Sequence, residues 1–315
     1  MSGEIGSVVI PTRERHRLLA QTVRSVLSGM RRPTEIVVID QSAAKASEIE
    51  ALAVGGTRIR YVWSAGRGLS RARNDGIGHA RHPLIAMIDD DVELDPRWLD
   101  ALLSALIARG PRAVVTGRVL PGPTPTGEDY VPSVRLSEVP ASYRGRLGED
   151  VLFGNNFAMR RDVVDEVGWF DERLGAGARW SAAEDNDFGF RLLEAGYSIH
   201  YVPEAVLTHL AWRTTRQLGR LRWGYGRGQG GFYAKHWSAR DSHLKGRLLR
   251  DLGASVGAAA RFGVRLDPWA ATHAAHAAGL VSGFLHWRAI RPPAPPSLQG
   301  GPEHSRERGV QEGAR

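Results

Sequence analysis

Residues 68–91, GLSRARNDGIGHARHPLIAMIDDD, join a helix-like run to a short apolar run and three consecutive acids. Leu84–Ile88 is typical of a buried strand, and Gly68–His79 of a helix. The first half of the chain repeats this alternation. Further strands are expected at Ser7–Ile10, Glu35–Ile39, Ile59–Trp63 and Ala113–Val119, and helices at Arg15–Ser28, near Ser47–Val54 and from Asp95 to about Ala108. This pattern predicts an α/β fold with a mostly parallel central sheet flanked by helices.

The second half divides into a continuation of this domain, a basic extension and a tail. A long loop at Pro121–Gly148 precedes elements expected at Phe153–Met159, Arg161–Val167, Glu184–Ala195 and Ser198–Val202. We therefore expect one domain over residues 1–210, a basic helical extension over 211–291 and a disordered tail over 292–315. Within the extension, GYGRGQGG at Gly224–Gly231 follows no strand and is interpreted as a flexible basic loop.

The net charge of +8 comes from one segment of the 315-residue chain. The chain has 42 Lys and Arg residues, of which ten lie between Ala211 and Arg250 and 32 lie elsewhere. It has 34 Asp and Glu residues, of which one lies in that segment and 33 lie elsewhere. Aromatic residues alternate with these basic residues. Such a segment suits nucleic acid, a membrane surface or a polyphosphate-linked substrate, with a solvated charged face as the alternative.

Three features bear on the cellular compartment. The chain has no cysteine, which excludes a disulfide framework and a thiolate metal site. Its N-terminus lacks the basic and apolar regions of a secretory signal, so a cytoplasmic location is expected. Trp269–Trp287 is rich in Ala and Gly and is interrupted by histidines, which favours a packed or interfacial helix over a membrane span.

Polar clusters follow the predicted strands at the end where parallel sheets bind ligands. They are Pro11–Glu14, Asp40 and Asp89–Asp91. On an extended backbone Asp89 and Asp91 point to the same side, as a hard cation such as Mg²⁺ or Mn²⁺ requires. An acidic turn is the alternative interpretation.

Three other groups could carry chemistry. Asp185, at the start of a predicted helix beside Glu184, is a candidate general base, although carboxylates there also serve as helix caps. The glycines and three arginines of Gly66–Ile77 suit a diphosphate, without a dinucleotide-binding or Walker A spacing. His209 is a candidate metal ligand or a structural histidine.

Taken in order, the motifs resemble the family 2 glycosyltransferases with the GT-A fold, from about Gly6 to His236. The matching segments are VVIPTRER (Val8–Arg15), VVIDQS (Val37–Ser42), GLSRARNDGI (Gly68–Ile77), IDDDVE (Ile88–Glu93), GNNFAMRR (Gly154–Arg161), LGAG…EDNDFGFRLLEAGY (Leu174–Tyr197), VPEAVLTH (Val202–His209) and YGRGQGGFYAKH (Tyr225–His236).

The resemblance implies roles for individual residues. Binding of a nucleoside-diphosphate sugar is implied for Pro11, Thr12, Arg13, Glu14, Asp40, Gly68, Arg71, Arg73, Asn74, Asp89 and Asp90. A divalent metal, Mn²⁺ or Mg²⁺, is implied at Asp89 and Asp91, with His209 as a further ligand. Catalysis is implied for Asp185 and Glu184, and contact with the sugar or acceptor for Gly154, Asn155, Asn156 and Trp180. Gln41 departs from the acid usual in the family, which leaves the nucleotide open.

The expected activity is inverting transfer of a hexosyl or other sugar to an acceptor hydroxyl, in cell-surface polysaccharide or glycolipid synthesis. The acceptor is expected to be a glycan or lipid-linked glycan, reached through peripheral membrane contact of residues 211–250 at the inner face. Two alternatives stay open, a nucleic-acid-binding protein and a nucleotidyltransferase. No nucleic acid is expected under the first interpretation.

Overall fold

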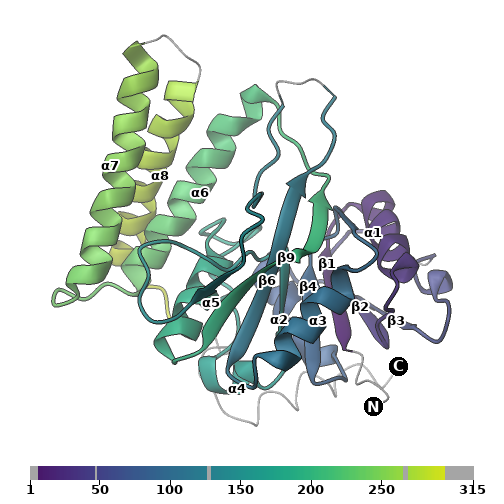
Figure 1. The fold of residues 1–315 in the computed structure, drawn as a ribbon. Helices are drawn as coiled ribbons and strands as arrows, with labels where there is room; N and C mark the ends of the chain where they lie inside the picture. Colours follow the sequence, from purple (N-terminus) through teal and green to yellow (C-terminus); the bar gives the residue numbers. More distant parts are fainter. Residues whose placement is uncertain (1–5, 47, 126–128, 265–268, 295–315) are drawn as a thin grey trace.

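The computed structural model describes residues 6–46, 48–125, 129–264 and 269–294 (Figure 1). The strands are β1 (Ser7–Thr12), β2 (Glu35–Asp40), β3 (Arg58–Trp63), β4 (Leu84–Ile88), β5 (Val92–Leu94), β6 (Ala113–Pro121), β7 (Ala141–Tyr143), β8 (Asn156–Arg160) and β9 (Ser198–His209). The α-helices are α1 (His16–Ser28), α2 (Leu69–His79), α3 (Trp98–Ala108), α4 (Val163–Val167), α5 (Glu184–Glu194), α6 (Thr215–Lys235), α7 (Ser242–Val264) and α8 (Trp269–Ile290).

All nine strands form one sheet in the order β3-β2-β1-β4-β8-β6-β9-β5, with β7 on the side of β9. Strands β1 to β4 are parallel, and β6 and β9 run in the same direction. Strand β8 lies antiparallel between β4 and β6, and β5 and β7 are antiparallel to β9. The expected mostly parallel sheet is confirmed. The short antiparallel strands β5 and β7 were not expected from the sequence.

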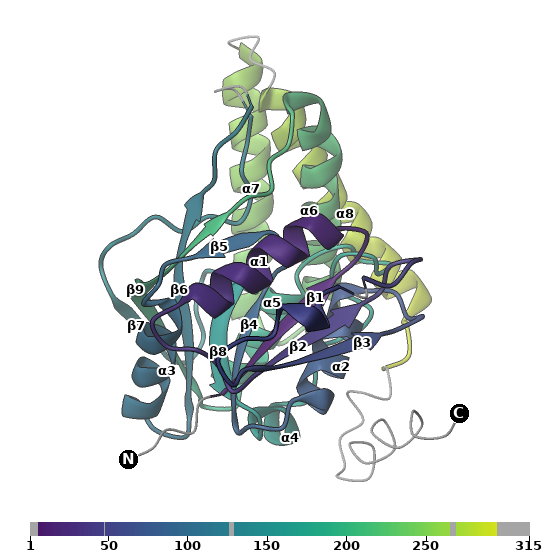
Figure 2. The same ribbon diagram turned by 90° about the vertical axis from the view of Figure 1, so that its right-hand side faces the viewer.

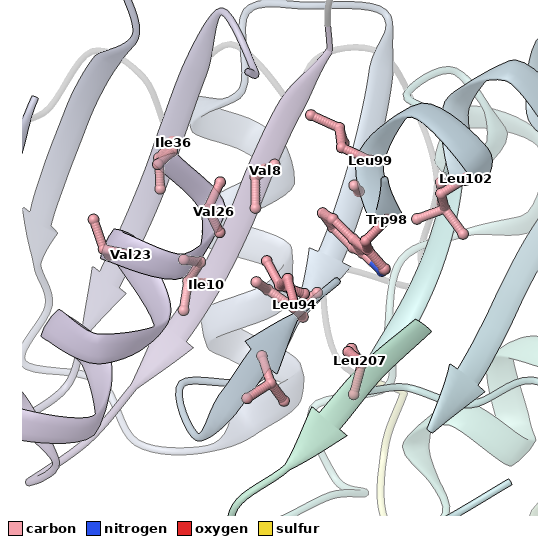
Figure 3. Packing of buried hydrophobic residues seen from close by; sticks show 14 of the residues in the cluster. Val8, Ile10, Val23, Val26, Ile36, Leu94, Trp98, Leu99, Leu102 and Leu207 are labelled. Atoms are coloured by element: carbon pink, nitrogen blue, oxygen red, sulfur yellow. The ribbon is translucent and has the colours of Figure 1, made fainter. Parts of the chain in front are cut away.

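Helices cover both faces of the sheet, so its central strands are buried on both sides. Helices α1 and α3 pack on one face, where Val23 and Trp98 meet Val8 and Leu207 (Figure 3). Helices α2, α4 and α5 cover the other face through a second apolar cluster. Burial on both faces explains why β1, β2 and β4 are almost continuously apolar rather than alternating.

Helices α6, α7 and α8 form a bundle that stands beside the sheet and rises above it in both views (Figure 1 and Figure 2). The expectation of a flexible loop at 224–231 is wrong, because the whole stretch lies inside α6. A Cβ at Gly226 or Gly230 would collide with the backbone of α8, so these glycines allow close packing of the two helices. Among the described residues, no helix is both long enough and apolar enough to cross a lipid bilayer.

Two other expectations need correction. The helix expected near Ser47–Val54 is only a 3₁₀ turn at Glu50–Leu52, and Ser47 lies outside the described residues. Strand β9 continues past Val202 to His209, because it pairs with both β6 and β5. The predicted disordered tail lies outside the described residues from position 295. Before that point, the carbonyls of Pro292 and Pro293 accept hydrogen bonds from Arg173.

Candidate active site

A cavity of about 740 Å³ lies between the ends of β1 and β4, the first turn of α5 and the bundle. A cavity of this size suits a substrate-sized ligand. Thirteen of the residues predicted for the site line it: Pro11, Thr12, Arg13, Gly68, Arg73, Asp89, Asp90, Asp91, Gly154, Asn155, Glu184, Asp185 and His209. The folded chain thus brings residues from six segments of the sequence together around one cavity.

Asp89, Asp91 and His209 form a compact cluster of ligand atoms. One donor atom from each lies within 4.8 Å of the others. The Nε2 atom of His209 is 3.2 Å from Oδ1 of Asp91, while Nδ1 lies 2.9 Å from the carbonyl oxygen of Pro132. Donation from Nδ1 to that carbonyl leaves Nε2 directed at the two carboxylates, as in metal-binding histidines. Burial lowers the pKa of His209, but its hydrogen bond with Asp91 raises it above the usual value.

Asp90, between the two clustered carboxylates, makes a different set of contacts. Its Oδ2 accepts a hydrogen bond of 2.6 Å from Oγ1 of Thr12, and its Oδ1 lies 3.2 Å from Nη1 of Arg15. Burial raises the pKa of Asp90 to about 6, and the charge of Asp91 raises it as well. Arg15 also pairs with Asp91, so its guanidinium balances charge at this end of the cavity.

Arg73 links this acidic cluster to the start of α5. Its side chain is buried, with Nη1 2.8 Å from Oε1 of Glu184 and Nη2 3.3 Å from Oδ1 of Asp89. Nη2 also donates to the carbonyl of Gly154 at 2.9 Å. Arg73 therefore fixes three parts of the cavity relative to one another, and its guanidinium is not free to bind a diphosphate.

Asp185 and Glu184 share the first turn of α5 but differ in surroundings. Oδ2 of Asp185 accepts from the backbone N–H of Gly154 at 3.1 Å, and its side chain faces the cavity. Glu184 is 7% exposed, and burial raises its pKa to about 7, with the charge of Asp185 adding and that of Arg73 opposing. Of the two carboxylates, Asp185 is better placed to receive a proton from a ligand in the cavity.

Six predicted residues do not line the cavity. Asp40 is fully buried, where it accepts from Tyr61 and from the N–H of Ser42. Glu14 is exposed and accepts from the N–H of Ala43, and Arg71 is exposed on α2. None of these three side chains lines the cavity in this structure, so their predicted contacts with the donor are not supported by its geometry.

The other three residues outside the cavity are buried and bonded to protein groups. The side chain of Asn74 bonds the backbone of Phe170 in both directions, and Asn156 donates to the carbonyls of Arg118 and Ala205. Trp180 is 1% exposed, and its indole N–H donates to the carbonyl of Gly283 in α8. The predicted donor contact of Asn74 and acceptor contacts of Asn156 and Trp180 are replaced by structural roles.

Several lining residues escaped the sequence analysis. They are Arg15, Gln41, Ser133, Asp150, Arg213, Tyr225, Gln229, Asp251 and His276. Gln41 and Arg15 are next to predicted residues and could have been included on that ground. The remainder come from the long loop and the helical extension, where no strand end marks them as facing a site.

Comparison with known proteins assigns this fold and site to a class. The family model described as glycosyl transferase family 2 matches residues 7–168, just over half of the chain. The chain belongs to this family. The assignment favours sugar transfer over nucleic-acid binding and nucleotidyl transfer, the two alternatives weighed from the sequence.

Curated relatives and solved structures agree with this assignment. The chain is 26% identical over 220 residues to a glucosyl-dolichyl phosphate glucuronosyltransferase of Haloferax volcanii, covering 64% of this chain and 68% of that protein. It is 28% identical over 211 residues to a pre-mycofactocin glycosyltransferase of Mycobacterium tuberculosis, covering 64% of this chain but only 42% of that protein.

A solved structure shows that the fold is shared. It is the mannosyltransferase PcManGT from Pyrobaculum calidifontis in complex with GDP-Man and Mn²⁺, with a TM-score of 0.58 at 15% identity. The likeness covers 89% of this chain and 87% of that one, so it includes much of the helical bundle. The protein is thus a glycosyltransferase with a GT-A-like fold.

Proposed function

We propose that the protein transfers a sugar, with inversion, from a nucleoside-diphosphate donor to an acceptor hydroxyl, and that a divalent metal is required. The observation that carries the proposal is the placement of the Asp89–Asp91–His209 cluster and Asp185 in one cavity, where buried Arg73 pairs with Asp89 and with Glu184 beside Asp185. A cation site and a carboxylate that faces the same cavity match the two needs of the reaction, a stabilised leaving group and a base.

The residues of the cluster fit a divalent cation. Two carboxylates and one imidazole nitrogen supply three ligands, and carboxylates are the preferred ligands of Mg²⁺ and Mn²⁺. When bound, the ion stabilises negative charge on the departing diphosphate. The Mn²⁺ in the PcManGT complex supports the same choice for this chain. Arg15 would then be released from Asp91 and could contact a phosphate oxygen.

Asp185 is the proposed base. It takes the proton of the acceptor hydroxyl while that oxygen bonds to the anomeric carbon. The bond from this carbon to the phosphate oxygen breaks, and its electron pair leaves with the nucleoside diphosphate. Glu184 is unsuited to the task, because Nη1 of Arg73 already occupies its Oε1. Its part is to hold Arg73 against Asp89.

The nucleoside of the donor is assigned to the side of the cation cluster away from Asp185. Pro11, Thr12 and Arg13 line it at the end of β1, facing Gln41 and Gly68. The side-chain amide of Gln41 bonds both the N–H and the carbonyl of Gly68, which fixes the glycine that precedes α2. Gln41 therefore takes the lining position that the sequence analysis had given to Asp40.

A role in cell-surface polysaccharide or glycolipid synthesis, with the protein at the cytoplasmic face of a membrane, is the wider proposal. The lipid-linked sugar in the name of the Haloferax volcanii relative supports it. Trp212 and Trp223 are each 38% exposed near exposed Arg216 and Arg220, as expected of a surface that meets anionic lipid. Sedimentation with anionic liposomes at low salt tests this part, and failure to co-sediment would refute it.

The transfer reaction is tested by replacing Asp185. With a panel of nucleoside-diphosphate sugars and Mn²⁺, we expect Asp185→Asn to abolish transfer while nucleotide binding persists. The anomeric configuration of the product, read by NMR, reports inversion. Asp165→Asn on the exposed side of α4 is the matched control. Near-normal turnover of Asp185→Asn would remove this residue from the mechanism.

A further inference from the structure

The helical bundle supplies one wall of the cavity. Its lining residues are Leu221, Tyr225 and Gln229 of α6, Asp251 of α7 and His276 of α8. Among the described lining residues of these helices none is Lys or Arg, although the 211–250 segment carries ten. Arg213, which precedes α6, lines the cavity near Asp91 at the cation end.

Two basic residues of the bundle have partners outside the cavity wall. Nζ of Lys235 lies 2.8 Å from Asp171 and 2.6 Å from Asp187, beneath α5. Nη2 of Arg247 lies 2.5 Å from Oδ1 of Asp150. Two cations of the 211–250 segment therefore form ion pairs that attach the bundle to the rest of the protein.

A chain of hydrogen bonds runs from the proposed base to this wall. The N–H of Asn186 donates to Oδ1 of Asp185, and the Nδ2 of Asn186 donates to Oε1 of Gln229 at 2.8 Å. Nε2 of Gln229 donates in turn to Oδ2 of Asp150 at 3.2 Å. Gln229 is 7% exposed, so its orientation is held firmly. A group bound against Gln229 and Asp150 would therefore lie beside Asp185.

Beside this wall, the residue before β8 has a buried acceptor atom without a partner. In the described part of the chain, Oδ1 of Asn155 is buried and has no hydrogen-bond partner, while Nδ2 donates weakly to the carbonyl of Ser133. Tyr225 also bonds Ser133 and faces the cavity. A buried amide oxygen without a donor is unfavourable, so it indicates a position where a ligand donates a hydrogen bond.

We propose that this wall, together with Asp150 and Asn155 beside it, is the acceptor subsite and that it takes a neutral, polyhydroxylated ring, such as the end of a glycan. The inference rests on the proposed sugar transfer. Carboxylate and amide groups at Asp150, Gln229 and Asn155 match the several hydroxyls of a sugar, and the ring of Tyr225 can cover its apolar face. The charge of Asp150 is already balanced by Arg247, so Asp185 and Asp251 are the carboxylates that disfavour a phosphate at the same place.

The test compares neutral methyl glycosides of glucose, mannose and galactose with the 6-phosphates of the same sugars. Release of nucleoside diphosphate from the donor is measured with and without each compound. We expect the neutral glycosides to stimulate release and the phosphates not to. In Gln229→Ala the KM for the glycoside should rise about fivefold to tenfold, the range of one lost hydrogen bond, with the dissociation constant of the nucleotide unchanged.

Arg261→Ala, on the exposed side of α7, is the control and should behave as wild type. Preference for the sugar phosphates, no stimulation by any neutral glycoside, or an unchanged KM in Gln229→Ala would overturn the inference, provided the donor is still slowly hydrolysed. If no nucleotide sugar is bound or hydrolysed at all, the proposed function itself fails, and the inference with it.

Discussion

Arg73 is a buried cation whose contacts belong to three different parts of the site. Burial lowers its pKa, but Glu184, Asp89 and Asp185 together raise it above the usual value, so the guanidinium stays charged. Its two terminal nitrogens reach Glu184, Asp89 and the carbonyl of Gly154 at once. A planar fork can do this, whereas the single ammonium group of lysine cannot.

This geometry leads to a prediction for Arg73→Lys. Either Asp89 or Glu184 should lose its ion-pair partner, so the position of Asp89 relative to α5 is no longer fixed. We expect kcat/KM to fall by about 10-fold to 100-fold, the range seen when groups that orient metal ligands are replaced, together with a higher Mn²⁺ requirement. Arg71→Lys, two positions away on the exposed side of α2, is the control and should leave both values unchanged. Equal losses in the two variants would contradict the role given to Arg73.

Asp187 illustrates a second buried charge, at the junction of α5 with α6. Burial raises its pKa, but Lys235, Arg191 and His236 outweigh this and lower it well below the usual value. The unfolded chain therefore binds a proton at this residue at about pH 3.9, where the folded protein does not. In that range the unfolded state holds more protons, so stability falls as pH falls.

The expected result concerns Asp187→Asn, measured by urea unfolding between pH 7 and pH 3. Near pH 7 the variant should be less stable by about 3–5 kcal/mol, because Lys235 is left buried with one partner fewer. The contribution of Asp187 is fully present above about pH 5 and is lost on acidification below its unfolded pKa. The difference from wild type should therefore shrink towards pH 3. A constant difference would show that the charge of Asp187 is not responsible.

At the scale of elements, α6 depends on glycine on two of its sides. Gly226 and Gly230 face the backbone of α8 at His276 and Leu280, and Gly279 of α8 faces Trp223 in return. Gly228 lies against Ala182, in the segment that leads into α5. Helix α6 thus packs tightly against α8 on one side and against the residues that precede Asp185 on another. This packing fixes the position of Gln229.

Gly230→Val tests this packing. The added side chain must push α6 from α8, so we expect a loss of about 1–3 kcal/mol or more, measured by denaturant unfolding. Gly219→Ala on the same helix has open space around its Cβ and should be neutral or stabilising by roughly 0.5–1 kcal/mol. If both variants behaved alike, helix propensity rather than close packing would explain the glycines.

The same elements show how far the sequence predicts the structure. Strands β1, β2 and β4 are recognisable because burial on both faces makes them apolar throughout, and the acids after β4 follow from their position at a strand end. His209, far along the chain, joined them only through the family resemblance. The helical extension was expected, but the continuity of α6 through 224–231 was missed because the glycines there, which serve packing, are typical of loops.

Polar residues proved the hardest to assign. Asp40, Asn74 and Asn156 are fully buried and bonded to protein groups, and nothing in a single sequence separates them from ligand-binding polar residues. Gln229 shows the reverse case, since it lines the cavity only because α6, far along the chain, packs against α5. The place of a polar residue in the folded chain, rather than its type, decides whether it is buried against protein groups or lines the cavity.

For the whole molecule, the cavity combines two parts of the chain that the sequence analysis treated separately. The sheet contributes the nucleoside end and the cation cluster, and the bundle contributes the wall beyond Asp185. The acceptor hydroxyl and the departing diphosphate would then lie on opposite sides of the anomeric carbon, as a single displacement with inversion requires. The central claim is that a nucleoside diphosphate binds through a divalent ion held by Asp89 and Asp91.

Thermal unfolding with UDP, GDP, dTDP and ADP, each with and without Mn²⁺, tests that claim most directly, alongside an Asp89→Asn/Asp91→Asn variant. A ligand present at 100 times its dissociation constant stabilises the folded state by about 2.7 kcal/mol, which a melting curve resolves. We predict that at least one nucleotide stabilises the wild type only with Mn²⁺, and that the variant loses this response. Stabilisation that is independent of metal, equal in the variant, or absent for every nucleotide would contradict the account.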